Sequence, residues 1–266
     1  AVLTVQFGLS PWLSLPVAIL LPGVIAWVLG RTLSRLSGYY LAMATLAVGI
    51  VIHTALLELK PLTKGASGLY GIPKLQLSGF AFQAGVSYYY LVWFCALLVI
   101  LLSLNLLHSR IGRALRSIHD SEVAARSLGV DTGQFKMKVF VLSAMLAGLA
   151  GFLYTHLNYS INPGAFHLDT SILFVTMVVL GGAASIWGAV LGTALVFVLK
   201  LLIETLGRHV SFVTSEFESV IFGAILILVI IFMPRGLVPS LAETFRRSAR
   251  ATGVDSGKQR AGMPEA

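Results

Sequence analysis

The sequence predicts an all-α fold, a polytopic transmembrane helical bundle of about seven spans. Of the 266 residues, 57% are hydrophobic and 11% are charged, against roughly 45–50% and about 25% in soluble domains. The mean hydropathy is +0.88, and runs of about 20 apolar residues recur, each long enough to cross hydrocarbon roughly 30 Å thick. We expect one transmembrane domain over residues 1–240 and a disordered, basic cytoplasmic tail over residues 241–266.

The apolar runs place the expected spans in order. The stretch from Ser171 to Ile203 is too long for one crossing at about 1.5 Å per residue. The cluster from Gly181 to Ser185 in its middle offers a tight turn, so this stretch predicts a hairpin of two short spans. The expected spans cover residues 11–29, 39–57, 88–107, 138–157, 170–184, 187–206 and 218–233.

Basic residues between the spans predict the orientation. With the loop after the first span in the cytoplasm, that side holds fourteen Lys and Arg: two in this loop, six between residues 110 and 138, and six from Arg235 onward. The other side holds four, and Lys200 near a span end can reach the interface. This bias predicts an external N-terminus and a cytoplasmic C-terminus. The net charge of +8 therefore reflects membrane topology, and we expect no nucleic-acid partner.

The cytoplasmic segment at about residues 108–137 is the most informative. Ile111, Ala114, Leu115 and Ile118 share a helical face, with Arg113 and Arg116 off it, and Asp120 can cap a second helix that Gly129 can end. A basic connector held by lipid headgroups is one interpretation. The pattern Glu122-x-Ala124-Ala125-x-x-x-Gly129 favours another, a short helix that seats in a partner's groove.

That pattern resembles the cytoplasmic loop by which ABC-importer permeases dock onto their ATPase subunits. Four further segments narrow the likeness: residues 37–47, residues 62–73, Val178–Gly188 with its Gly-Gly and Ser-Ile-Trp-Gly, and Met-Pro-Arg-Gly-Leu at 233–237. Together they are similar to the M-type permease of high-affinity branched-chain amino-acid importers. The likeness runs from about residue 11 to 240, and it implies that the family's N-terminal part is missing here.

The resemblance implies a fold of the ABC-importer permease type, in a multi-pass protein of the bacterial inner membrane. Its expected partners are ATPase subunits, a second permease subunit, a substrate-binding protein and the lipid bilayer. No cofactor is expected on this chain, because ATP and Mg²⁺ belong to the ATPase subunits. The coupling-loop residues are expected to be Arg113, Arg116, Glu122, Ala124, Ala125 and Gly129.

Two further sets of residues are candidates for the substrate path and the external face. The first set either lines the translocation path or lets helices pack closely; it comprises Thr45, Gly49, Gly181, Gly182, Ser185 and Gly188. The second set either contacts the substrate-binding protein or forms a turn; it comprises Ser67, Gly68 and Gly71.

Catalytic chemistry finds no support in the sequence. The six histidines are scattered without metal-ligand spacing, so we expect no metal site, and no nucleophile elbow or phosphate-binding loop is present. Glu58, Glu204 and Glu218 lie near span ends, which argues against the buried relay of an ion-coupled carrier. The chain is therefore expected to be a transport subunit, and the resemblance implies branched-chain amino acids as its cargo; a urea or short-amide permease and a secondary carrier are the alternatives.

Overall fold

The computed structural model describes residues 1–33, 36, 39–77, 80–82, 85–183, 185–207 and 224. The chain divides into two compact units, Ala1–Leu168 and Asp169–Ala266, and each is described by itself. Apart from residue 224, the expected seventh span lies outside the described residues, and so do the Met-Pro-Arg-Gly-Leu segment and the tail.

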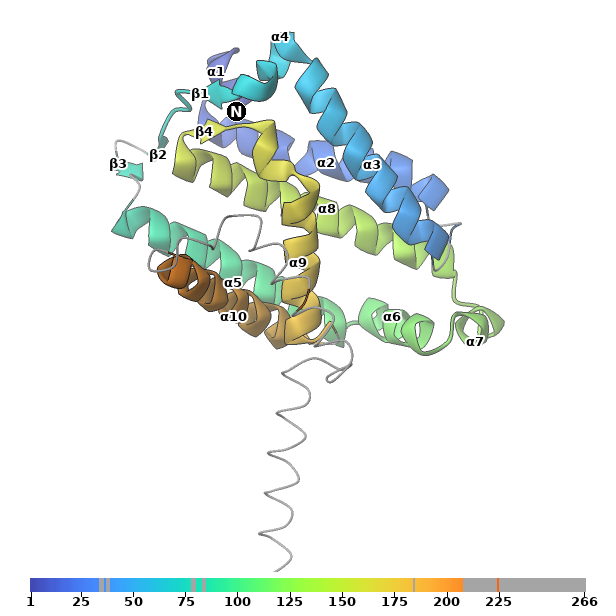
Figure 1. Ribbon diagram of the computed structural model, residues 1–266. Coiled ribbons are helices and arrows are strands. Elements are labelled where there is room, and N and C mark those ends of the chain that lie inside the picture. Colours follow the sequence, from blue (N-terminus) through green and yellow to red (C-terminus); the bar gives the residue numbers. More distant parts are fainter. Residues whose placement is uncertain are drawn as a thin grey trace, which may run out of the picture. The chain divides into compact units, whose positions relative to one another are not determined.

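The described residues are predominantly helical, as the sequence predicts (Figure 1). Five helices are long and apolar enough to cross a membrane: α2, α3, α5, α8 and α10. The 14 residues of α9 span only about 21 Å, so a count of seven crossings is not established. The elements are α1 (Val2–Val5), α2 (Pro11–Leu33), α3 (Tyr39–Glu58), α4 (Lys60–Thr63), η1 (Gly65–Ser67), β1 (Leu69–Tyr70), β2 (Leu75–Leu77), β3 (Phe80–Phe82), α5 (Val86–His108), α6 (Arg110–Asp120), α7 (Glu122–Ser127), α8 (Thr132–Asn158), β4 (Ser160–Ile161), η2 (Pro163–Phe166), α9 (Leu168–Gly181) and α10 (Ile186–Gly207).

Helices α2 and α8 form the closest pair in the first unit and run antiparallel (Figure 1). Glycines on both helices set the contact. A Cβ atom at Gly23 would lie 2.8 Å from Met145, and one at Gly30 would lie 3.3 Å from Met137. The missing side chains let the two backbones approach, which is how helices associate in lipid, where the hydrophobic effect gives no drive between them.

Pro22 explains a third contact of this pair. Proline has no N–H, so the carbonyl of Ala18, four residues earlier in α2, lacks its usual helical donor. Gly148 of α8 faces this carbonyl, and a Cβ atom there would collide with the Ala18 oxygen and lie 3.1 Å from Pro22 Cγ. The neighbouring helix therefore covers a carbonyl that would otherwise face lipid.

One end of the first unit is built from short strands and turns, and we call it the β end (residues 59–85 and 159–167). Strand β1 pairs antiparallel with β4, and β2 pairs antiparallel with β3. Trp12 Nε1 donates to the Gln76 carbonyl at 2.6 Å, and Tyr88 Oη donates to the Leu153 carbonyl at 2.6 Å. The buried cluster of Leu75, Tyr88 and Phe152 joins β2 to α5 and α8.

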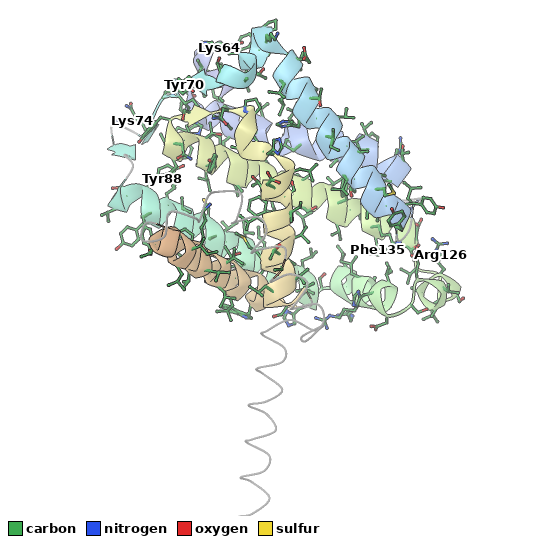
Figure 2. All side chains as sticks on the ribbon, viewed as in Figure 1. Lys64, Tyr70, Lys74, Tyr88, Arg126 and Phe135 are labelled. Carbon is green, nitrogen blue, oxygen red and sulfur yellow. The ribbon has the colours of Figure 1, made fainter. Side chains whose placement is uncertain are left out.

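Helices α6 and α7 lie at the opposite end of this unit, which we call the α7 end. The labelled side chains of Figure 2 separate in the same way. Lys64, Tyr70 and Lys74 mark the β end, and Arg126 and Phe135 mark the α7 end. Within this unit, Lys64 and Lys74, which are predicted to be external, therefore lie at the β end, and Arg126, which is predicted to be cytoplasmic, lies at the α7 end.

The long helices carry many exposed apolar side chains (Figure 2). Helix α3 has no buried residue, and its exposed side chains include Met43, Leu46 and Val51. Such a surface suits hydrocarbon, not water.

In the second unit, α9 and α10 form the hairpin predicted for residues 171–203. Leu180 and Val196 are its buried residues, with Leu173, Met177, Leu199 and Ile203 packed against them.

Candidate functional site

The candidate site is the segment from α6 to the start of α8, and its first feature is the sharp turn between α5 and α6. Ser109 caps α6, and its Oγ accepts hydrogen bonds from the N–H groups of Ile111 and Gly112. Gly112 is buried, and a Cβ atom there would collide with the Leu107 carbonyl. Glycine is required because the first turn of α6 folds back onto the last turn of α5.

Arg113 and Arg116, both predicted as coupling residues, turn back toward α5. Arg113 Nη1 donates to the His108 carbonyl, and Arg116 Nη2 donates to the Leu107 carbonyl, each at 3.4 Å. Carbonyls at the end of a helix have no partner within it and favour positive charge. Both arginines thus brace α6 against the end of α5.

Helix α7 is short, and its two ends are well capped. Ser121 Oγ accepts from the Ala124 N–H at 3.3 Å. The expectation that Asp120 would cap this helix is wrong, because Asp120 is the last residue of α6. The prediction that Gly129 ends it is confirmed. Gly129 has φ of 81°, its N–H donates to the Arg126 carbonyl, and the Val130 N–H donates to the Ala125 carbonyl, which is a Schellman motif.

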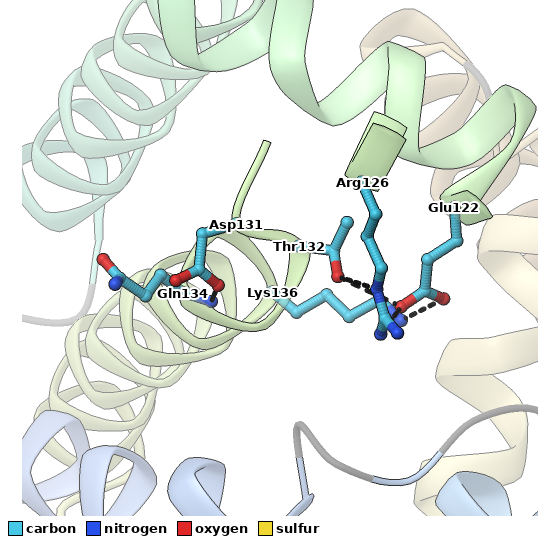
Figure 3. Close-up of polar contacts among 6 residues, drawn as sticks. All are labelled: Glu122, Arg126, Asp131, Thr132, Gln134 and Lys136. Atoms are coloured by element: carbon cyan, nitrogen blue, oxygen red, sulfur yellow. Dashed lines mark hydrogen bonds and ion pairs between the residues drawn. The ribbon is translucent and has the colours of Figure 1, made fainter. Parts of the chain in front are cut away.

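Four side chains tie α7 to the start of α8, and we call them the Glu122 cluster (Glu122, Arg126, Thr132 and Lys136; Figure 3). Glu122 Oε1 lies 2.7 Å from Arg126 Nη2, and Oε2 lies 2.6 Å from Lys136 Nζ. Thr132 Oγ1 donates to Glu122 Oε1 at 3.2 Å and accepts from Arg126 Nε at 2.9 Å. Both carboxylate oxygens are therefore engaged within the chain.

The Glu122 cluster contains one acidic side chain and two basic ones. The pKa of the Glu122 carboxyl is lowered, first because Lys136 donates a hydrogen bond to it, and further by the charges of Lys136 and Arg126 and the Thr132 hydroxyl; partial burial opposes the shift. Glu122 also lies in the first turn of α7, where the helix dipole favours a carboxylate. Glu122 is thus ionised at neutral pH.

Away from the Glu122 cluster, α7 has exposed apolar side chains, with the exposed Ser127 among them. We call Val123, Ala124 and the C-cap residue Leu128 the α7 apolar face. Val123 is 77% exposed and Leu128 is 81% exposed, and Ala124 is also exposed. Ala125 is 1% exposed and lies on the inner side. The helix is therefore held from within by Glu122 and Ala125 and presents an apolar surface outward.

Glycines of the second unit bring α9 and α10 into backbone contact. A Cβ atom at Gly181 would collide with the Gly188 carbonyl, and one at Gly192 would collide with the Met177 carbonyl. Gly182 has φ of 106°, and Ser185 Oγ accepts from the Gly188 N–H at 3.4 Å. Gly181, Gly188 and Gly192 thus lie where two backbones pack closely, and a role in the translocation path stays a prediction.

The remaining predicted residues lie apart from this site. At the β end, Ser67 and Gly71 are exposed. Gly68 has φ of 73° and adjoins Asn162, where a Cβ atom would not fit. In α3, Thr45 Oγ1 donates within its own helix to the Ala42 carbonyl at 2.9 Å. Gly49 faces open space, so α3 presents both residues on an exposed face.

Sequence reasoning missed half of the site. Arg126 and Lys136 entered only as charges that set orientation, and Thr132, Val123 and Leu128 did not enter at all. A signal was available for Arg126, since it lies four residues after Glu122 on one helix. Across the described part of the chain, no group of three or more His, Cys, Asp or Glu side chains could hold a metal ion.

Comparison with known proteins identifies a matching family and several relatives. The sequence profile described as "Branched-chain amino acid transport system / permease component" matches residues 1–230. The high-affinity branched-chain amino acid transport system permease protein LivM of Salmonella typhimurium is 30% identical over 95% of this chain and 63% of its own length. LivM of Escherichia coli is 30% identical over 90% of this chain and 60% of its own length.

A second kind of relative matches a shorter part. The permease protein LivH of Salmonella typhimurium is 32% identical over 55% of this chain and 46% of its own length. The chain spans about three fifths of the length of the two LivM proteins, and no solved structure matches it significantly. Since the profile covers most of the chain, the chain belongs to the family of branched-chain amino acid transport system permease components.

Proposed function

We propose that the chain is a permease subunit of an ATP-driven importer that moves branched-chain amino acids inward across the bacterial inner membrane. Family membership supports the cargo, because the LivM relatives are named as permeases of high-affinity branched-chain amino acid transport. The proposed mechanism depends on the exposed α7 apolar face. Val123 and Leu128 are more than three quarters exposed, and they lie outside the apolar bundle on a segment that the Glu122 cluster holds in place. Uncovered apolar surface of this kind favours a protein partner.

In this proposal the α7 apolar face seats in a groove of an ATPase subunit in the cytoplasm. ATP and Mg²⁺ bind to that subunit, and this chain supplies no catalytic group. Helix-in-groove docking uses a few apolar anchors on one face, which Val123 and Leu128 provide. Arg113 and Arg116 hold α6 against the end of α5. A displacement of α7 therefore does not simply bend the turn between α5 and α6.

The other partners follow from the two ends of the bundle and from the relatives. The β end, with Ser67 and Gly71 exposed, faces outside and receives a substrate-binding protein. Salmonella typhimurium has both a LivM and a LivH permease protein of one named transport system, and both resemble this chain. We therefore propose a second, related permease chain as the partner across the substrate path.

The docking role is tested by placing a charge on the α7 apolar face. Val123→Asp is expected to lower leucine uptake about tenfold or more and to abolish co-purification of the ATPase subunit, because a desolvated charge opposes docking. Val86→Asp is the matched control for ATPase retention, which it should leave intact: Val86 is 72% exposed but begins α5 at the β end. Normal uptake and ATPase retention in Val123→Asp would refute docking through this face.

The cargo is tested separately, on the partner that selects it. Calorimetric titration of the cognate substrate-binding protein with leucine is expected to give heat, and titration with urea is expected to give none. Binding of urea without leucine would replace the proposed substrate and leave the docking proposal untouched.

A further inference from the structure

The Glu122 cluster has a role that docking alone does not require. A carboxylate at the start of a docking helix could face its partner, but both Glu122 oxygens are engaged within the chain, at 2.6–2.7 Å from basic groups. The ion pair between Arg126 and Glu122 stays within α7, and Arg126 reaches α8 only through the hydrogen bond that its Nε donates to Thr132 Oγ1 at 2.9 Å. Thr132 and Lys136 belong to α8, so their contacts with Glu122 cross from the docking helix to a membrane-spanning helix.

Lys136 makes the stronger of these two crossings. It is the fifth residue of α8, and its side chain and that of Glu122 are 28% and 29% exposed. Arg126 is 64% exposed, so solvent screens its pair with Glu122 much more. The contact between Lys136 and Glu122 joins two ionised groups at 2.6 Å, whereas in the 3.2 Å hydrogen bond from Thr132 only the acceptor is charged.

The chain connections alone would not fix the angle of α7. A single residue, Ser121, separates α7 from α6, and only residues 128–131 separate it from α8. A helix of six residues held at its ends can still tilt, and only cross-links between side chains prevent tilting. Beyond Lys136, α8 packs on α2 at Met137 and Phe140, which adjoin Gly30.

We propose that Lys136 is a positioning residue for transport: its ion pair with Glu122 carries displacement of α7 into α8, and the α2–α8 pair moves as one body. This inference rests on the proposed function, because it assumes that an ATPase subunit moves α7. It adds that Glu122 acts toward Lys136 of its own chain and not toward a basic residue of the ATPase.

The test is a double-mutant cycle with Glu122→Gln, Lys136→Gln and the double variant, assembled with the cognate ATPase. Each single variant is expected to lower leucine transported per ATP hydrolysed about tenfold, as coupled contact pairs can. The ATPase should remain bound because the α7 apolar face is unchanged. The double variant should lose no more than either single one, and Lys136→Arg should retain transport, since arginine can also pair with a carboxylate.

Lys138→Gln is the matched control. Lys138 lies two residues after Lys136, on roughly the opposite side of α8, and its Nζ lies 5.4 Å from the Phe135 ring centre. Multiplying losses in the double variant, or equal losses in Lys138→Gln, would overturn the proposal. Failure of the wild-type chain to retain any ATPase would instead overturn the proposed function, so the two failures are distinguishable.

Discussion

At the scale of single residues, Glu122 decides how α7 is held. Its carboxylate has two basic partners and a hydroxyl donor, and its helix position is one that sequence patterns associate with a docking surface. Its neighbours Val123 and Leu128 are far more exposed, so they and not Glu122 form the outward surface of this segment. The acidic residue of this motif, Glu122, thus fixes the position of α7 within its own chain.

The first prediction concerns the protonation of Glu122. The lowered pKa means that ionised Glu122 stabilises the folded chain fully above the ordinary glutamate pKa of 4.5. That contribution is lost only as the pH falls through the lower folded value. A carboxyl ¹³C NMR titration, assigned with Glu122→Gln, should give a midpoint below 4.5, and Lys136→Met should raise it. A wild-type midpoint above 4.5 would contradict the cluster.

The sequence predicted residues of this site unevenly, for a physical reason. Gly129 was predictable because a helix end needs a residue that tolerates positive φ. Lys136 was not, because its partner lies 14 residues away, beyond any helical spacing. Only the fold of residues 128–131, with its Schellman motif and the Asp131 cap on α8, brings them together.

At the scale of elements, the α2–α8 pair shows how backbone approach replaces the hydrophobic effect. Gly23, Gly30 and Gly148 leave room at successive points along the pair. The sequence predicted both helices from their apolar runs, with ends within about six residues. It did not predict that they pair, because apolar periodicity cannot identify which helix faces which when all faces are apolar.

A matched pair of substitutions tests this packing. Gly148→Ala is expected to lower the free energy of unfolding by about 2 kcal/mol or more, because its Cβ meets the backbone carbonyl of Ala18 and neither helix can yield cheaply. Gly151→Ala, with open space around the added carbon, should be neutral or slightly stabilising. Thermal unfolding of both variants in detergent checks this, and equal melting temperatures would contradict the described contact.

The α9–α10 hairpin was predictable for a different reason. A 33-residue apolar stretch exceeds one crossing, and a glycine cluster in its middle marks the break. The structure adds that Gly181, Gly188 and Gly192 meet backbone to backbone. The sequence alone could not separate close packing from a lining role, since both favour small residues.

At the scale of the whole molecule, the fold class followed from composition and the number of crossings did not. Five long apolar helices are described, α9 is shorter, and the expected last span lies largely outside the described residues. The charge bias assigns the α7 end to the cytoplasm, and this assignment remains a prediction.

Site-directed labelling tests the orientation. In a chain whose native Cys95 is replaced by Ser, Ser127→Cys should react with a membrane-impermeant maleimide only in inside-out vesicles. Ser67→Cys should react in spheroplasts, where the outer face is accessible. Both positions are exposed, so access depends on the side of the membrane. The reverse pattern would invert the topology and remove α7 from reach of any ATPase.

The pairing of β1 with β4 has a mechanical consequence. It links the segment after α3 to the end of α8, and the Ile72 N–H donates a further hydrogen bond to the Tyr159 carbonyl. The ends of α3 and α8 at the β end are therefore tied together, and this tie can act as a pivot for both helices. Helix α8, with 27 residues, is then a lever about 40 Å long. A swing of about 5° at the pivot carries its other tip, beside Lys136, through about 3.5 Å.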